Sequence, residues 1–264
     1  MSDVIAVLLA DATRATDAVH ALEARHAAGS LTIFGLALLG READGTLRLR
    51  RPATPGPSGA PLAGLVRRLV ARAGGTAEDG LADLGIAPDF VEEVLGALAP
   101  GHVALLAEVE EHWFVAGDAA LAAFEGSVIR RRRLHRGEDW IASEVSVLDA
   151  ELQALERAAE DAAGDLATAI RRRATADRVR LAALAARTDV SLAALHDEVR
   201  ARLALLDRQF RQADMAGDVR GETQVRIALS IARMRAEAER RSVRLRRAVE
   251  VAQQALGTED PEDG

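Results

Sequence analysis

The sequence predicts an α+β protein: a ferredoxin-like, mostly antiparallel sheet domain, then a long α-helical coiled-coil or helical-bundle region. Residues 1–137 hold six prolines and sixteen glycines, whereas residues 138–256 hold no proline and three glycines. These two residue types oppose helix formation most strongly, so the second half should be helical. We therefore predict an α+β domain at 1–136, a helical region of three helices at 137–256 and a disordered acidic tail at 257–264.

Residues 3–10 form a nearly continuous apolar run, which predicts a first strand. Asp11 can cap the helical pattern that follows it. Two further apolar runs, at 31–41 and 46–51, flank the dipeptide Asp44-Gly45. Asp-Gly favours the tight turn of a hairpin, so these runs are expected to pair as antiparallel strands.

The rest of the first half continues this alternation. The patterns predict a helix at 88–98, a strand at 102–110, a helix at 115–124 and a strand at 126–133. The order is thus β-α-β-β-α-β with an added α-β. This order predicts a ferredoxin-like sheet that helices cover on one face.

Residues 1–134 resemble the bacterial family called domain of unknown function 1269. The resemblance rests on the opening run DVIAVLLA, on the stretch GIAPDFVEEVLGALAPG at 85–101 and on the HVALLAEV that follows it. Members of that family typically insert a glycine-rich apolar segment, described as membrane-associated, before that helix. The corresponding region here, 53–75, is short, rich in proline and carries three arginines. The resemblance implies no activity.

Composition excludes several kinds of chemistry. All 34 basic residues are arginine, and lysine, cysteine and tyrosine are absent. The chain therefore has no lysine for a phosphate-binding loop or Schiff base, no thiol nucleophile and no tyrosine acid. The six histidines are scattered without metal-site spacing. We predict a protein that is not an enzyme, with no catalytic, cofactor-binding or metal-binding residues.

Charge and hydropathy limit the partners. Residues 1–125 carry 9 Arg against 17 Asp and Glu, and residues 126–264 carry 25 against 24. A nucleic-acid-binding protein should instead show a basic surplus and stacking aromatics, so nucleic acid is not an expected partner. No apolar run is long enough for a transmembrane span. The lack of cysteine favours a cytoplasmic location, with membrane-peripheral contact as an alternative.

Residues 62–73 have the spacing of an amphipathic helix, and their polar side carries Arg67, Arg68 and Arg72. Such a helix can lie on an anionic membrane. Alternatively, its apolar stripe packs on the sheet or on a neighbouring subunit, and we favour this packing.

Four consecutive arginines, Arg130 to Arg133, end the last predicted strand. They could hold a phosphate or a lipid headgroup. Ion pairs with Glu108, Glu110 and Glu111 at the end of the neighbouring strand would neutralise them without a ligand, and we favour this structural interpretation.

The helical half carries apolar stripes typical of a coiled coil. In the first stripe, from Ile141 to Leu166, the spacing alternates between 4 and 3 residues, as at a and d positions. Alanine fills much of it and buries little area, so we expect the stripes to form the seam of a homo-oligomer. The predicted seam residues are Ile141, Val145, Leu148, Leu152, Leu155, Leu166, Leu192, Leu195, Val199, Leu206 and Phe210.

We expect the first of these helices to run from Glu138 to Arg187, a length of about 75 Å. Thr188-Asp189 can cap the next helix, and a second joint is expected near 217–221. A third stripe runs through Val225, Leu229, Ala232, Ala236 and Val243, then shifts to Leu245, Val249, Ala252 and Leu256.

Two functions follow from these features. The first is a non-enzymatic structural or interaction protein that self-assembles through its helices and presents the α+β domain to itself or to a protein partner. The alternative is a peripheral membrane or envelope-stress protein that docks on anionic lipid through residues 62–73 and the arginine clusters.

Overall fold

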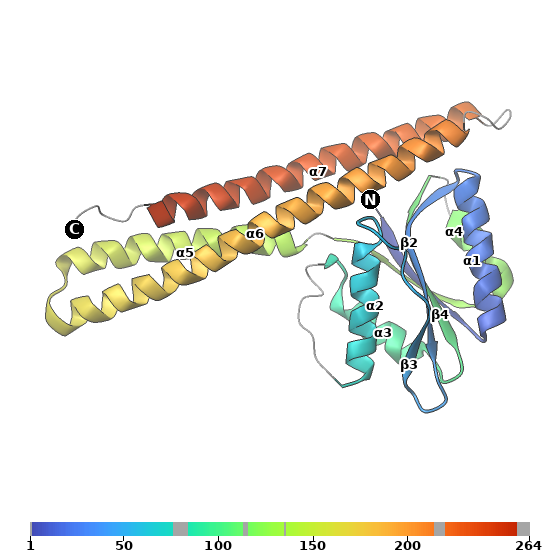
Figure 1. Cartoon of the computed structure of the whole chain (residues 1–264), viewed down its shortest axis with the longest axis horizontal. Coiled ribbons are helices and arrows are strands. Elements are labelled where there is room, and N and C mark those ends of the chain that lie inside the picture. The colour runs from blue at the N-terminus through green and yellow to red at the C-terminus, as the bar shows by residue number, and fades with distance from the viewer. Residues whose placement is uncertain (1, 76–83, 113–115, 135, 214–219, 258–264) are drawn as a thin grey trace. The chain divides into compact units, whose positions relative to one another are not determined.

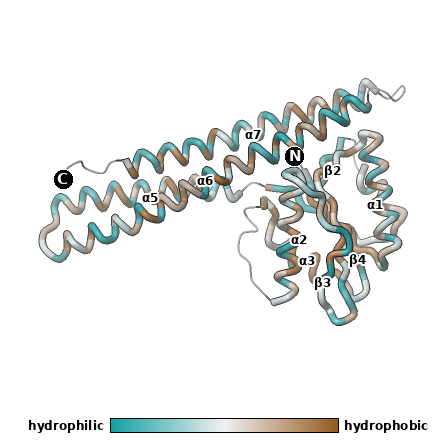
Figure 2. Tube along the Cα trace, in the orientation of Figure 1, coloured by the Kyte–Doolittle hydropathy of each residue, from teal (hydrophilic) through white to brown (hydrophobic). Residues whose placement is uncertain are grey.

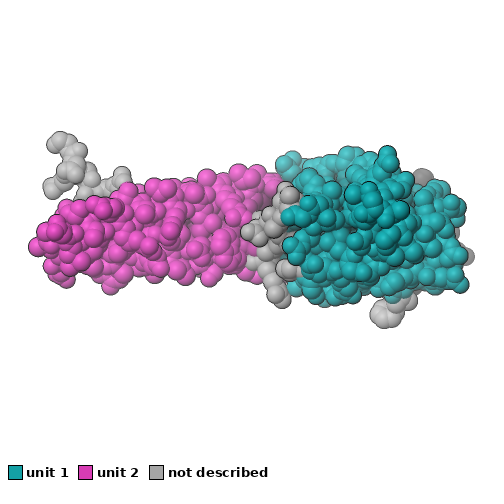
Figure 3. All heavy atoms as spheres, turned by 90° about the horizontal axis from the view of Figure 1, so that it is seen from below, with its two compact units in different colours: residues 1–135, 197–237 teal, residues 136–196, 238–264 magenta. Residues whose placement is uncertain are grey.

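The computed structural model describes residues 2–75, 84–112, 116–134, 136–213 and 220–257. The chain forms two compact units, coloured separately in Figure 3. Unit 1 comprises residues 1–135 and 197–237, and unit 2 comprises residues 136–196 and 238–264. The predicted class, an antiparallel sheet followed by long helices, is confirmed. The division of the chain is less simple than predicted, because part of the helical half belongs to the unit that contains the sheet.

Five antiparallel strands form the sheet of unit 1, in the order β3-β2-β4-β1-β5. The strands are β1 (Asp3–Leu9), β2 (Leu31–Arg41), β3 (Leu47–Arg51), β4 (Val103–Glu111) and β5 (Ser127–Arg132). The helices between them are α1 (Ala12–Ala27), α2 (Ala60–Ala73), α3 (Pro88–Ala97), α4 (Ala116–Leu121) and the short η2 (Ala122–Phe124). Figure 1 shows this arrangement.

The strand order is consistent with a ferredoxin-like sheet, although the elements that build it differ from the prediction. Strands β2, β4, β1 and β5 are neighbours in that order, and the connections β1-α1-β2 and β4-α4-β5 are its two halves. Strand β3 and helices α2 and α3 are inserted between the halves. The final α-β pair is therefore part of the central arrangement and not an addition to it.

Helices cover both faces of the sheet, so the prediction of one covered face is wrong. On one face, Ile5 and Val7 of β1 pack with Val19 and Leu22 of α1. On the other face, Val4 and Ala6 share a core with α2 and α3. Successive strand residues point to opposite faces, so a strand buried on both sides must be apolar on both, as residues 4–9 of β1 are.

Helices α6 (Gly164–Ala213) and α7 (Arg220–Gly257) each contribute one segment to unit 1. These segments, 197–213 and 220–237, are called the helical clamp below. Leu206 and Ile227 of the clamp enclose Phe34 of β2, and all three side chains are buried. The clamp is therefore held to the sheet by an apolar contact as well as by the polar groups described below.

Unit 2 contains α5 (Arg136–Asp161) and the remaining parts of α6 and α7. Ile141 and Leu152 of α5, Leu181 of α6 and Ala252 of α7 lie in one buried core. Figure 2 shows how hydrophilic and hydrophobic residues alternate along these three helices. The alternation produces the apolar stripes from which the helices were predicted.

The first joint between the long helices differs from the prediction. Helix α5 ends at Asp161 and α6 begins at Gly164, so no helix runs from Glu138 to Arg187. Gly164 has φ of 61°, a left-handed conformation that glycine adopts without strain. The next change of helix falls between Ala213 and Arg220, and residues 214–219 lie outside the described part of the chain.

Thr188 does not begin a helix, because it lies inside α6. Its hydroxyl is buried and donates to the backbone oxygen of Leu184, at 2.7 Å. A threonine whose hydroxyl bonds to the preceding turn is satisfied within a helix and is not available as a cap. The predicted acidic tail, apart from Gly257 at the end of α7, lies outside the described residues.

Candidate functional site

Two carboxylates of β4 point to the sheet face that carries α2. Ala104 and Leu106 belong to the core on that face, and alternation places Glu108 and Glu110 on the same side. Both glutamates are buried, with exposed fractions of 0% and 3%. A carboxylate in such a place is costly unless cations or hydrogen-bond donors accompany it. Residues of the helical clamp supply them, together with Ser2 and Arg133.

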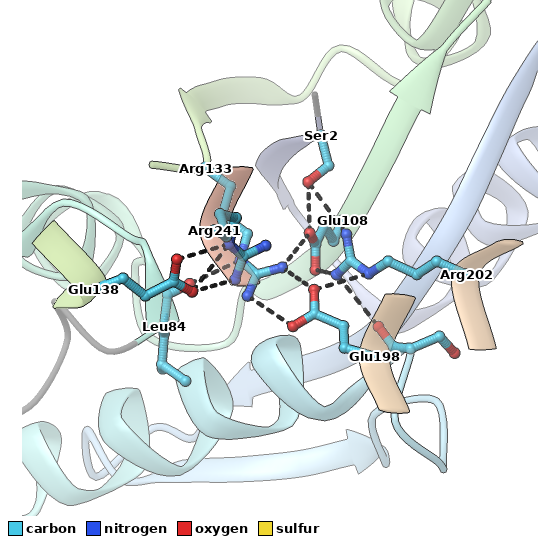
Figure 4. A network of polar contacts seen from close by, with 9 residues as sticks. Ser2, Leu84, Glu108, Arg133, Glu138, Glu198, Arg202 and Arg241 are labelled. Carbon is cyan, nitrogen blue, oxygen red and sulfur yellow. Dashed lines mark hydrogen bonds and ion pairs between the residues drawn. The ribbon is translucent and has the colours of Figure 1, made fainter. Parts of the chain in front are cut away.

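Glu108 belongs to a buried ion cluster, which we define as Ser2, Glu108, Arg133, Glu198 and Arg202 (Figure 4). Arg202 Nη2 lies 2.7 Å from Glu108 Oε2, and Arg133 Nη1 lies 3.4 Å from Glu108 Oε1. Glu198 joins both arginines, through Arg202 Nε at 3.0 Å and through Arg133 Nη1. The Ser2 hydroxyl donates to Glu108 Oε1 at 2.6 Å.

The cluster contains two positive and two negative side chains, so its charge is balanced. Burial opposes the ionisation of Glu108, but Arg202 and Arg133 outweigh burial and hold the pKa of this carboxyl below its usual range. Burial likewise disfavours the charge of Arg133, yet Glu108 and Glu198 raise its pKa. Glu108 and Arg133 therefore remain charged at neutral pH.

Both arginines of the cluster are also fixed by neighbouring groups. Arg133 Nε donates to the backbone oxygen of Leu84 at 2.8 Å. Arg202 lies over the ring of Phe34, with 4.4 Å from its guanidinium carbon to the ring centre. A guanidinium held by stacking and by carboxylates has one orientation, so the cluster sets the position of the helical clamp on the sheet.

A second set of polar contacts, the polar layer, lies farther along the same face. It consists of Thr32, His112, Gln209 and Ser230, which are all buried. Thr32 Oγ1 lies 2.7 Å from His112 Nε2 and donates to Gln209 Oε1. His112 Nδ1 lies 3.1 Å from the hydroxyl of Ser230. The layer thus joins β2 and the end of β4 to both segments of the clamp.

The contacts of the polar layer fit a neutral His112. The Thr32 hydroxyl donates to Gln209, so His112 Nε2 must carry the proton that it shares with Thr32. His112 Nδ1 is then an acceptor for Ser230. Burial lowers the pKa of His112 to about 4, and Arg233 and His26 act in the same direction, while Glu110 and Gln209 oppose them.

The polar layer predicts that acid destabilises unit 1. Between pH 6.5 and pH 4 the unfolded chain binds a proton at position 112 that the folded chain does not, so stability is complete above pH 6.5 and falls below it. The loss should reach about 3 kcal/mol for a shift of this size. Hydrogen exchange of β4 at pH 7.5 and pH 4.5 measures it.

His112→Gln should remove most of this pH dependence, whereas His20→Gln on the exposed side of α1 should retain it. Equal pH dependence in the wild type and in His112→Gln would contradict the assignment to His112. Burial also lowers the pKa of His26, so a smaller loss should remain in His112→Gln.

The polar groups of this site hold the helical clamp against the sheet. Its row of hydroxyl, imidazole and hydroxyl groups superficially resembles a nucleophile with its base, but Thr32 and Ser230 have no exposed surface. Among the described residues there is no group of three or more histidines and carboxylates that could hold a metal ion. Nor is any helix in the described ranges long and apolar enough to cross a membrane.

The structure pairs the four arginines that end β5 with carboxylates. Arg130 contacts Asp3 at 3.2 Å, Glu111 at 3.2 Å and Asp118 at 2.6 Å. Arg131 pairs with Glu93 of α3, Arg132 lies 3.9 Å from Asp3, and Arg133 belongs to the buried ion cluster. The favoured interpretation, neutralisation by carboxylates, agrees with these contacts. Most of the partners come from elements other than the end of β4.

The amphipathic stripe at 62–73 packs on the sheet. Leu62, Leu65 and Leu69 of α2 are fully buried among residues of β1 and β4. Arg67 and Arg72 lie on the outer side, where Arg72 pairs with Glu92 at 2.8 Å, and Arg68 is half-buried. The apolar face that lipid docking would need is thus already covered by the protein's own sheet.

The predicted seam does not form one surface. Within unit 2, Ile141, Val145, Leu148, Leu152 and Leu195 are buried, Leu155 packs against the core, Leu192 is half-buried and Leu166 is 63% exposed. In unit 1, Leu206 is buried, Val199 is half-buried and Phe210 is 36% exposed. The buried side chains of the first stripe therefore pack against other residues of the same chain.

Several residues of the site were not predicted from the sequence. Glu198, Arg202 and Gln209 lie on the face of α6 that packs on the sheet, and they come from a segment predicted to be part of an oligomer seam. Their spacing of 4 and 7 residues along one helix side was the available signal. Polar residues on a side that also carries Leu195 and Leu206 need buried partners.

Comparisons with known proteins find no match for this chain among family models, curated proteins or solved structures. The resemblance of residues 1–134 to domain of unknown function 1269 stays a prediction.

Proposed function

We propose that the chain is a non-enzymatic assembly protein, whose long helices bind further copies of itself. One observation carries this proposal. Of the thirteen large apolar side chains that are exposed in the described residues, nine lie on α5, α6 and α7. They are Trp140, Val147, Leu166, Val179, Val190, Phe210, Val225, Leu229 and Val243. These helices make up less than half of the chain.

The position of these side chains supports an assembly role for the helices. The apolar residues of the sheet and of α1, α2 and α3 are used to build unit 1, and its buried charges are paired with one another. The helices, in contrast, bury one stripe and leave other apolar residues in water. Exposed apolar residues gathered on particular elements are typical of interaction surfaces.

The alternative of lipid docking has less support. It depended on the apolar face of α2, which packs on the sheet, and on arginines at 130–133 that have carboxylate partners. No second function is therefore proposed.

Sedimentation velocity over a wide range of protein concentrations tests the assembly role. We expect a mass above the 28.0 kDa of one chain, and we expect it to rise with concentration. A mass of one chain at every concentration would contradict self-assembly.

A further inference from the structure

Helix α7 carries an exposed apolar stripe on the side opposite the sheet. The stripe consists of Val225, Leu229, Ala232 and Ala236, which are spaced by 4, 3 and 4 residues as at a and d positions. Val225 and Leu229 are more than half exposed, and both alanines are exposed. The buried side of the same segment carries Thr223, Ile227 and Ser230. The stripe is therefore not used by unit 1.

Helix α5 of unit 2 carries a similar stripe besides the one that forms its core. Its members are Trp140, Ser143, Val147, Ala150 and Ala154, and all are exposed. They are spaced by 3, 4, 3 and 4 residues. Trp140 and Val147 are each 50% exposed. Both stripes are rich in small residues, which let two helices approach closely.

The two stripes are bordered by opposite charges. The positions that flank the α7 stripe are Arg226, Ala228, Arg233 and Arg235. Those that flank the α5 stripe are Asp139, Glu144, Ser146, Glu151 and Gln153. Helix α5 as a whole has eight acidic residues against two arginines, and α7 has nine arginines against four glutamates. Like charges would oppose pairing of either stripe with its own copy, and opposite charges favour pairing of one with the other.

We propose that the α5 stripe of one copy binds the α7 stripe of a second copy, in antiparallel orientation. This proposal rests on the proposed self-assembly and names the surfaces that perform it. Because each copy carries one stripe of each kind, every such contact joins two different surfaces, one from each copy.

The flanking charges favour the antiparallel orientation. With Leu229 opposite Ala150, the stripe residues pair as Val225 with Ala154, Leu229 with Ala150, Ala232 with Val147, and Ala236 with Ser143. The flanking pairs are then Arg226 with Glu151 and Arg233 with Glu144. A parallel alignment of the same stripes, with Leu229 opposite Val147, sets Ala228 beside Glu151 and Ser146 beside Arg233. It forms one pair of opposite charges, Asp139 with Arg226, against two in the antiparallel alignment.

Two variants test the pairing, one for each surface. Glu144→Arg with Glu151→Arg reverses the charge beside the α5 stripe, and Val225→Glu with Leu229→Glu interrupts the α7 stripe. Each should raise the dissociation constant by at least roughly tenfold in sedimentation velocity. Val70→Glu is the matched control, because Val70 is a 39% exposed helical residue outside both stripes, and it should assemble like the wild type.

Mixing the two variants gives the sharpest result. The α5 variant keeps an intact α7 stripe and the α7 variant keeps an intact α5 stripe, so the mixture should form a dimer that neither variant forms alone. Circular dichroism melts of each variant verify that both remain folded. A folded variant of either surface that assembles as tightly as the wild type overturns the pairing, and so does a mixture that stays at the mass of one chain. In both cases an oligomeric wild type would still support self-assembly, whereas a monomeric wild type would contradict both proposals.

Discussion

Replacing Glu108 with glutamine should lower the free energy of unfolding of unit 1 by about 3–5 kcal/mol, the usual cost of removing one partner from a buried ion pair. The change keeps the size of the side chain but removes the charge that Arg133 and Arg202 share. Two buried guanidinium groups would then depend on Glu198 alone. Hydrogen exchange of β4 in increasing urea measures the loss in unit 1 separately from unit 2.

Two further variants distinguish charge from packing. Glu93→Gln removes one of the two carboxylate partners of Arg131, but this pair is partly exposed and Asp89 remains 3.5 Å away, so the loss should be about 1 kcal/mol or less. Glu108→Met combined with Arg202→Met leaves Arg133 and Glu198 as a balanced pair. We expect this double variant to be more stable than Glu108→Gln, because no unpaired charge remains buried. A double variant less stable than Glu108→Gln would show that the geometry of Arg202, and not charge balance, holds the clamp.

The elements of the sheet could be predicted because each is encoded locally. An apolar run bounded by turn residues, such as 31–41 before Asp44-Gly45, specifies a strand without reference to the rest of the chain. Which strands are neighbours depends on long-range contacts. The sequence order therefore suggested that the final α-β pair was an addition, whereas β5 is the edge strand beside β1 and completes the ferredoxin-like strand order.

The buried ion cluster could be predicted only in part. The carboxylates of β4 and the arginines at the end of β5 were expected to pair, because both occur at strand ends. Arg202 and Glu198 are separated from Glu108 by about ninety residues of chain, and no local pattern indicates that α6 returns to the sheet. A charged residue in an otherwise apolar strand signals that a buried partner exists, but it does not identify that partner.

The first joint of the long helices was misplaced for a physical reason. The a and d spacing continues from α5 into α6 across residues 162–163, so a seam of constant period does not reveal that the chain turns there. Gly164 was the local signal, since its left-handed φ is costly for other residues. A single glycine is often tolerated within a helix, so the continuous a and d spacing favoured an unbroken helix over a helix end at Gly164.

Leu152→Ala should lower the free energy of unfolding of unit 2 by about 2–5 kcal/mol, because it leaves a cavity in a packed core. Leu152 is 1% exposed and packs with residues of α6 and α7. Leu166→Ala is the matched control from the same predicted seam. Leu166 is 63% exposed, so its replacement should change stability by no more than about 0.5 kcal/mol.

The concentration dependence of this effect separates a core from an interface. A side chain buried within one chain costs the same free energy at every protein concentration, whereas a side chain buried between copies costs more when the protein is dilute. We expect the loss for Leu152→Ala, measured by hydrogen exchange of α5, to be constant over a hundredfold dilution. A loss that grows on dilution would show that the first stripe is buried between copies, as the sequence predicted. Constancy would leave the exposed stripes of α5 and α7 as the surfaces through which copies meet.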